Sequence, residues 1–193
     1  MINSKKEIPF YPQIWDLKNW HNLGFKSLEE AKYWQDSSCG ILCLKMATEG
    51  ILGREIDSVS TLISKGQSLG AYSDKDGWSH RGLAELAHSY GIQASLHERI
   101  STDDLIQFID QGAIPIVSIK WAFQPSKNLK DKLMFWKKRG GHLALVVGYK
   151  KGRGFFVHHT SITDGYNWNH KIVSFDEFEI GFTGRGIITT KGG

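Results

Sequence analysis

The spacing of apolar residues changes between the two halves of the chain. In the first half, apolar positions recur every three or four residues, which is typical of helices with one buried face. The clearest run starts at Cys39, includes Leu42 and Met46, and predicts a helix that ends near Gly50 or Gly53. Further helices are predicted over residues 57–64, from 79 to about 91, and from 101 to about 112.

In the second half, the apolar positions form continuous or alternating runs that are typical of strands. A buried strand is predicted over residues 142–149, and a glycine-bearing turn at 150–154 returns the chain as a hairpin strand over 155–159. The other strands are predicted over residues 92–97, 114–119, near 171–173, and over 186–189. Because helices come early and antiparallel strands come late, the pattern predicts an α+β fold.

Three segments lack a regular pattern. Residues 8–34 are rich in aromatic side chains and are expected to wrap the domain without regular structure. Residues 66–77 are rich in Gly, Ser and Asp, whereas residues 121–141 are basic and irregular. Because long loops of this kind are usually functional, we expect both to form walls of a binding cleft.

Composition and charge narrow the class of protein. The chain has 193 residues, of which 40% are hydrophobic, and this favours one soluble domain. The net charge is +4, but the basic residues are spread along the chain except at residues 137–139, so no nucleic-acid partner is expected. There is no apolar stretch long enough to span a membrane and no export signal near the start, which favours a cytoplasmic location.

The chain has two cysteines, Cys39 and Cys43, on neighbouring turns of one predicted helix. A disulfide is therefore not expected, and Cys43 is interpreted as a buried core thiol. Cys39 differs because Ser37 and Ser38, both good N-cap residues, precede it, and Gly40 follows. In the first helical turn, the unpaired N–H groups and the helix dipole favour negative charge, so a thiolate forms more readily there. This is what a cysteine nucleophile requires.

His142 is the candidate partner of this thiol. It follows Gly140 and Gly141 at the start of the longest predicted strand, where the glycines leave room for another element to approach. An imidazole in that place can take the proton of a thiol and then return it to a leaving amine. The sequence therefore predicts a cysteine–histidine pair, whose imidazole is normally oriented by a third group.

These residues carry a resemblance to a known family. Gln35, the run from Ser37 to Gly40, the strand at residues 141–149 and the closing pattern at 175–188 resemble the bacteriocin-processing (double-glycine) peptidases and their stand-alone relatives, which are papain-like cysteine peptidases. The resemblance implies Cys39 as nucleophile, His142 as general base and Gln35 as donor to an oxyanion hole completed by the Cys39 N–H. It implies no cofactor.

The resemblance also implies a fold. A helical lobe at about residues 30–112 should pack on an antiparallel sheet lobe at about 113–190, within one papain-like domain that covers residues 1–193. The cleft between the lobes would hold a peptide or small amide substrate.

The chain departs from the family pattern in two places. In the family's best-known members, the glutamine stands slightly further upstream of the cysteine than Gln35 does. An orienting Asp or Asn is expected where residues 156–160 lie, and the matching residue is His159, which supplies no negative charge. Asp164 and Asn167 are alternative orienting residues. His158, next to His159 in a strand, should face the opposite side of the sheet.

Other uses of the histidines are less favoured by their spacing. His142, His158, His159 and His170 lie close in sequence, but no two have the helical spacing of a zinc motif, so no metal site is expected. His80 and His88 are interpreted as solvated or capping residues. The predicted function is peptide or amide hydrolysis through a thioester, and the alternative is a peptide-binding module of the same fold with weakened catalysis. Acyl transfer to an amine would use the same residues.

Overall fold

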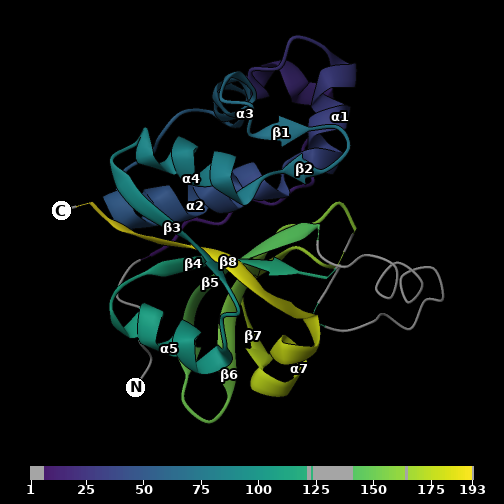
Figure 1. The fold of residues 1–193 in the computed structure, drawn as a ribbon. Helices are drawn as coiled ribbons and strands as arrows, with labels where there is room; N and C mark the ends of the chain where they lie inside the picture. Colours follow the sequence, from purple (N-terminus) through teal and green to yellow (C-terminus); the bar gives the residue numbers. More distant parts are fainter. Residues whose placement is uncertain (1–6, 121–122, 124–140, 164, 193) are drawn as a thin grey trace.

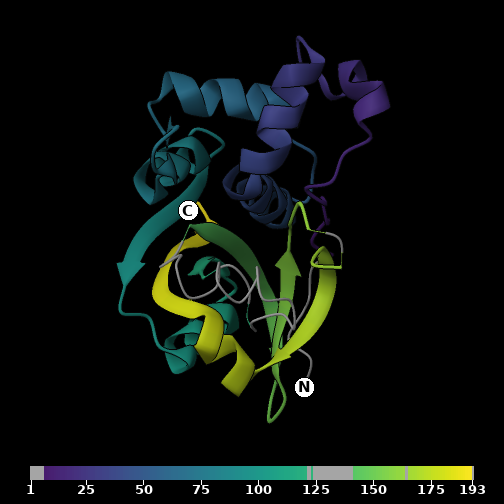
Figure 2. The same ribbon diagram turned by 90° about the vertical axis from the view of Figure 1, so that its right-hand side faces the viewer.

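The computed structural model describes residues 7–120, 123, 141–163 and 165–192. Within these ranges, helices and a sheet form three layers, with the sheet in the middle (Figure 1). Helices α1 to α4 lie above one face, and α5 and α7 lie against the other; the view turned by 90° shows the same order of layers (Figure 2). Most of the expected loop at 121–141, with its basic run, falls outside the described residues.

The helices begin and end where the sequence supplies caps. Their bounds are η1 Leu17–Leu23, α1 Leu28–Ser37, α2 Cys39–Leu52, α3 Val59–Ser68, α4 His80–His88, α5 Thr102–Asp110 and α7 Phe175–Gly181. Serine side chains accept hydrogen bonds from first-turn N–H groups at the start of α1, α3, α4, α5 and α7. Helix α2 ends at Gly53, whose left-handed conformation (φ 68°) lets its N–H bond to the carbonyl of Glu49.

The main sheet has six antiparallel strands in the order β3-β8-β4-β5-β6-β7. The strands are β3 Ile92–Glu98, β4 Ile114–Ile119, β5 His142–Lys150, β6 Gly154–His159, β7 Trp168–Ser174 and β8 Phe182–Lys191. Since β3 pairs with β8 along its whole length, residues 92–98 belong to the sheet. The lobe boundary expected near residue 113 is therefore too late in the chain, because the last strand draws an earlier one into the sheet.

Strand β5 shows why the central strands consist of uninterrupted apolar residues. Its residues Leu143 and Leu145 pack into a cluster with α2 and α4, whereas Ala144 and Val146 pack into a second cluster with α5 and α7. Both faces of the strand are thus covered, so neither set of alternate residues can be polar. The α+β architecture predicted from the sequence is confirmed.

Two segments expected to be irregular contain regular structure. Residues 8–34 include η1 and most of α1, where Ser27 caps the helix and Ala31 and Trp34 are buried. The loop expected at 66–77 contains the end of α3 and most of a small hairpin, in which β1 Tyr72–Ser73 pairs with β2 Gly77–Trp78. Burial of aromatic side chains against other elements stabilises these short elements, and such burial has no helical or alternating period to recognise in the sequence.

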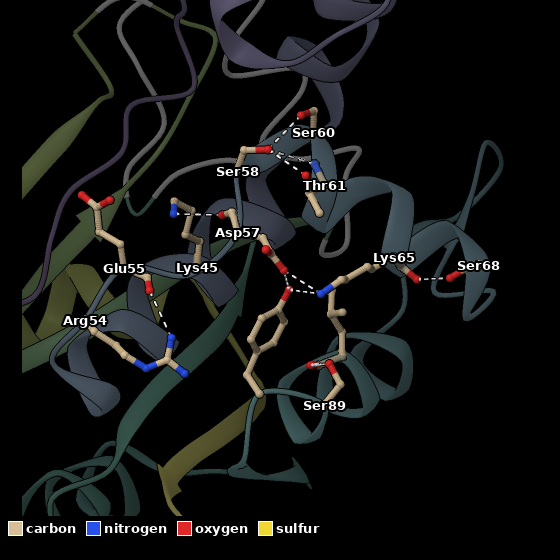
Figure 3. A network of polar contacts seen from close by, with 12 residues as sticks. Lys45, Arg54, Glu55, Asp57, Ser58, Ser60, Thr61, Lys65, Ser68 and Ser89 are labelled. Carbon is tan, nitrogen blue, oxygen red and sulfur yellow. Dashed lines mark hydrogen bonds and ion pairs between the residues drawn. The ribbon is translucent and has the colours of Figure 1, made fainter.

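A polar network connects helices α2, α3 and α4 to one another (Figure 3). The Lys65 ammonium donates to the carboxylate of Asp57 (2.6 Å), and the Tyr90 hydroxyl donates to the same carboxylate oxygen. Lys45 of α2 donates to the main-chain carbonyl of Asp57 (3.1 Å) and pairs with Glu49. The network joins α2 to the start of α3 and the end of α4. The helix that begins with Cys39 is therefore held in place by its neighbours.

Candidate active site

Cys39 and His142 line one cavity of about 850 Å³. Its walls come from the junction of α1 and α2, the β1–β2 hairpin, the start of α4, the end of β4 and the start of β5. Tyr72 and Trp78 supply aromatic surface, and several charged residues surround them. The structure thus brings the predicted nucleophile and the predicted base to the same pocket.

Cys39 is the first residue of α2, as predicted. The capping differs from the expectation. Ser38 is both the C-cap of α1 and the N-cap of α2, and its side chain makes no cap hydrogen bond. Trp78 fixes this corner: its indole N–H donates to the Ser37 carbonyl (2.8 Å), and a Cβ at Gly40 would lie 3.0 Å from the Trp78 side chain. Gly40 is thus needed for close packing at the start of the helix.

The two cysteines differ in burial. Cys39 is partly exposed at the pocket, whereas Cys43 is fully buried and is the core thiol that the sequence predicted. Burial raises the pKa of the Cys43 thiol well above its ordinary value, and the neighbouring Cys39 raises it further. Only the thiol at the pocket is therefore suited to react.

His142 is the first residue of β5 and is oriented by a main-chain carbonyl. Its Nε2 lies 2.6 Å from the carbonyl oxygen of Thr160. Since a carbonyl oxygen can only accept, Nε2 carries the hydrogen, and in the neutral ring Nδ1 is left as the basic nitrogen. This contact fixes both the tautomer and the direction of the ring.

The predicted orienting residues lie around this contact. The ring of His159 packs beside that of His142, with centroids 4.8 Å apart, and its Nδ1 is bonded to the Tyr166 carbonyl (2.5 Å). Asn167 holds the segment that carries the Thr160 carbonyl, because its side chain accepts from Ser161 N (3.0 Å) and donates to Ser161 O (2.6 Å). Asp164 lies outside the described residues.

His158 faces away from this group, which confirms the alternation predicted from the strand. Its Nε2 bonds to the Ile8 carbonyl (3.2 Å), and its Nδ1 accepts from the main-chain N–H of His170 (2.9 Å). Burial lowers the pKa of His158 to about 4, an effect that the hydrogen bond to Ile8 opposes and His170 reinforces. His158 is therefore a neutral histidine with both ring nitrogens bonded inside the fold.

Gln35 is not among the residues that line the cavity, but a different glutamine is. Gln13 lines it and is only 2% exposed. Its side-chain Nε2 donates to the main-chain carbonyl of Gln35 (2.7 Å), and its main-chain N–H donates to Asn167 (3.2 Å). Within the described part of the chain, the Gln13 Oε1 atom has no hydrogen-bond partner. Sequence reasoning missed Gln13 because it lies in the irregular N-terminal segment, far upstream of Cys39, whereas the family pattern directed attention to a position only slightly upstream of Gln35.

His80 was also misjudged from the sequence. It lines the pocket and its Nε2 lies 2.7 Å from Oγ of Ser118, a buried residue near the end of β4. Burial lowers the pKa of His80, and the charge of Arg185 lowers it further against the opposing effect of Glu98. His88, in contrast, accepts from the main-chain N–H of Ala94 (3.1 Å). His80 is therefore a pocket residue, not a solvated one.

Solved structures share this arrangement of elements. A double glycine motif protease from an AMS/PCAT transporter, in complex with the leader peptide, matches with a TM-score of 0.58 at 14% identity over 96% of this chain and 93% of that one. A C39-like peptidase from Bacillus anthracis matches with a TM-score of 0.62 at 15% identity over 99% and 98%. The chain has the fold of the double-glycine peptidases.

A third structure extends this similarity. The peptidase domain of Streptococcus ComA, a bifunctional ABC transporter, matches with a TM-score of 0.55 at 17% identity over 80% of this chain and 92% of that one. No protein-family model and no curated protein matches the sequence. The double-glycine peptidase fold is thus recognised through the structure, and no helix in the described ranges is long and apolar enough to cross a bilayer.

Proposed function

We propose that this protein is a cysteine peptidase or amidohydrolase that cleaves a peptide or amide bond through a thioester on Cys39. The observation that carries the proposal is that Cys39 and His142 line one pocket while the Thr160 carbonyl holds Nε2 of His142. That contact leaves Nδ1 as the base for the thiol proton. The peptidases and peptidase domains that share the fold add support.

The reaction proceeds in two stages. Cys39 Sγ gives its proton to His142 Nδ1 and attacks the substrate carbonyl carbon, and the C–N bond breaks as Nδ1 returns the proton to the leaving amine. Water then attacks the thioester, with Nδ1 again taking a proton, and the carboxylic acid leaves as the thiol re-forms. No cofactor takes part.

Two further groups act around these steps. Gln13 replaces Gln35 as the side-chain donor to the oxyanion, together with the Cys39 N–H, because Gln13 lines the pocket and Gln35 supplies only a main-chain carbonyl to it. The Thr160 carbonyl replaces His159 as the orienting group for His142, and it stabilises an imidazolium as a hydrogen-bond acceptor without a full negative charge.

The substrate class follows from the pocket and from the related folds. A cavity of about 850 Å³ accommodates several residues of a peptide. The transporter protease of the same fold is seen with a leader peptide. We therefore propose a peptide substrate for this chain, acted on by one domain in the cytoplasm.

Alkylation by iodoacetamide at slightly acidic pH tests the proposal. The thiol at the pocket should react at least ~10-fold faster than free cysteine, as thiolates paired with a histidine do. Mass spectrometry should place the label on Cys39 alone, since Cys43 is fully buried. Cys39→Ala should abolish labelling, and His142→Ala should slow it.

A matched control uses the histidine on the other side of the sheet. His158→Gln changes a ring that faces Ile8 and His170, so the labelling rate should stay near that of the parent. If Cys39 reacts no faster than free cysteine, catalysis by the Cys39–His142 pair is ruled out and the peptide-binding module becomes the better account.

A further inference from the structure

One end of the pocket carries polar groups that the proposed reaction does not use. His80 begins α4, Ser118 lies near the end of β4, and Arg185 lies on β8, and all three line the cavity that holds Cys39. Ser118 is 4% exposed and its Oγ is 2.7 Å from Nε2 of His80. A buried hydroxyl and a half-buried imidazole facing a cavity are typical of a recognition site.

The charge at this end is positive. Arg185 is exposed, and although Glu98 is its cross-strand neighbour, no ion pair joins them and none joins Arg185 to any other described residue. Its charge reaches His80, since it contributes to the lowered pKa of that ring. The first N–H groups of α4 add the positive end of a helix dipole at the same place.

Negative charges in the pocket belong to other elements. Asp36 is on α1, whereas Asp74 and Asp76 are on the β1–β2 hairpin, where Asp74 accepts from the Tyr33 hydroxyl and Asp76 from Ser73. The cavity therefore has a side formed by α1 and the hairpin that carries three carboxylates and Lys75, and a basic side formed by α4, β4 and β8, next to which Lys120 also lines the cavity. A substrate that spans the cavity contacts both of these sides.

This end also lies close to the reacting pair. In the β4–β5 ladder, Ile119 is opposite His142, and Ser118 is opposite Leu143. Adjacent strands are about 5 Å apart, so the main chain of Ser118 lies near that of His142; their side chains leave opposite faces of the sheet, yet both residues line the one cavity.

We propose that His80, Ser118 and Arg185 form a subsite for a carboxylate of the substrate. Arg185 supplies the charge, and the His80–Ser118 pair supplies one hydrogen bond: when Nε2–H of the neutral ring donates to Ser118 Oγ, the hydroxyl hydrogen of Ser118 is left to donate to the carboxylate. The proposal deepens the proposed function and rests on it for the identity of the reacting bond. The carboxylate comes either from the C-terminus of a short peptide or from an Asp or Glu side chain.

Paired alkylating reagents test the subsite. N-iodoacetylglycine carries a terminal carboxylate, and N-iodoacetylaspartic acid α-amide carries a side-chain carboxylate; each is compared with its uncharged carboxamide. For each pair, the measured quantity is the ratio of the alkylation rate with the carboxylate to the rate with the carboxamide. In at least one pair, this ratio should be about 10-fold higher for Cys39 than for free cysteine, because one charge-assisted hydrogen bond gives this factor. The pair that shows the preference identifies the source of the carboxylate.

A charge-matched pair of variants provides the control. Arg185→Gln should remove the preference, whereas Arg153→Gln removes the same charge from the exposed β5–β6 turn outside the pocket and should leave it unchanged. Equal rates for carboxylate and carboxamide in both pairs would overturn the subsite. The proposed function would survive that result if Cys39 still reacted fast with the uncharged reagents.

A second measurement does not need a reactive thiol. In protein labelled at histidine, NMR titration with N-acetylglycine, and separately with N-acetylaspartic acid α-amide, should shift the His80 ring signals saturably and raise the pKa of His80, because an anion offsets the Arg185 charge. The corresponding amides should have little effect. Unmoved His80 signals would refute the subsite, whereas a response alongside an inert Cys39 would refute the proposed function alone.

Discussion

The side of the pocket formed by the helices and the side formed by the sheet hold the residues proposed for catalysis by different means. On the helix side, aromatic packing dominates: Trp78 fills the space beside Gly40 and Gly66, where a Cβ would lie 3.0 Å and 2.5 Å from it. On the sheet side, polar contacts dominate, since the Thr160 carbonyl holds His142 and Asn167 holds the main chain next to Thr160.

The two sides of the pocket share one feature, a main-chain carbonyl that orients a side chain. Gln13 on the helix side is held by the carbonyl of Gln35, and His142 on the sheet side by the carbonyl of Thr160. In both cases the orienting group is a main-chain carbonyl. The side chains of the residues that supply it, Gln35 and Thr160, are therefore not constrained by this role. Removing functional side chains on each side should therefore have large effects, whereas changing the side chains of the residues that orient them should not.

The largest effect is expected on the sheet side. His142→Ala removes the proposed base, and thioester formation should slow by ~10²–10⁴-fold, the usual contribution of a general base. Release of nitrophenol from the p-nitrophenyl ester of a blocked glycylglycine would measure this step. If the rate of nitrophenol release falls by less than a few-fold in the variant, His142 does not take the thiol proton.

The next effect compares two glutamines on the helix side. Gln13→Ala should slow the same release of nitrophenol by ~10²–10³-fold, since it removes an oxyanion donor. Gln35→Ala should retain most of the rate, because the carbonyl that binds Gln13 remains. The opposite ranking would return the oxyanion role to Gln35. Alkylation by iodoacetamide forms no oxyanion, so its rate should change little in either variant.

A third prediction concerns the stability of the sheet side against pH. His158 has a folded-state pKa of about 4, below its ordinary 6.5, so the unfolded chain binds the proton first as the pH falls. Its contribution to stability is complete above about pH 6.5 and is lost progressively down to about pH 4. Between pH 7 and pH 5, the free energy of unfolding should fall by about 2 kcal/mol from this group. Urea unfolding at the two pH values should show a smaller fall in His158→Gln, and equal falls would contradict the assignment.

The smallest effect tests the link between the two sides. Asn167 bonds to Gln13 N and to both main-chain groups of Ser161, so Asn167→Ala loosens both sides at once. We expect about a 10-fold loss in nitrophenol release and about 1–3 kcal/mol in stability, the usual cost of unmaking buried hydrogen bonds. Asn167→Asp keeps the acceptor and should recover part of the rate. A loss of stability with an unchanged rate would show that Asn167 supports the fold without positioning the site.

Prediction from the sequence succeeded where the pattern is local. The helix starting at Cys39, the strand starting at His142 and the burial of Cys43 all follow from apolar spacing and caps, and all are confirmed. It failed for Gln13 and His80, which reach the pocket from an irregular segment and from the start of a short helix. No periodicity marks such residues, because only distant parts of the chain bring them to the site.

The sequence by itself determined the α+β order of elements and pointed to the two residues that we propose for thiol chemistry. A helix start favours a thiolate, and a strand start after two glycines gives an imidazole a rigid and accessible mount. Only the tertiary structure decided which groups orient them. Those groups are carbonyls of the main chain, such as that of Thr160, and every residue has one, so their role depends entirely on where the fold places them.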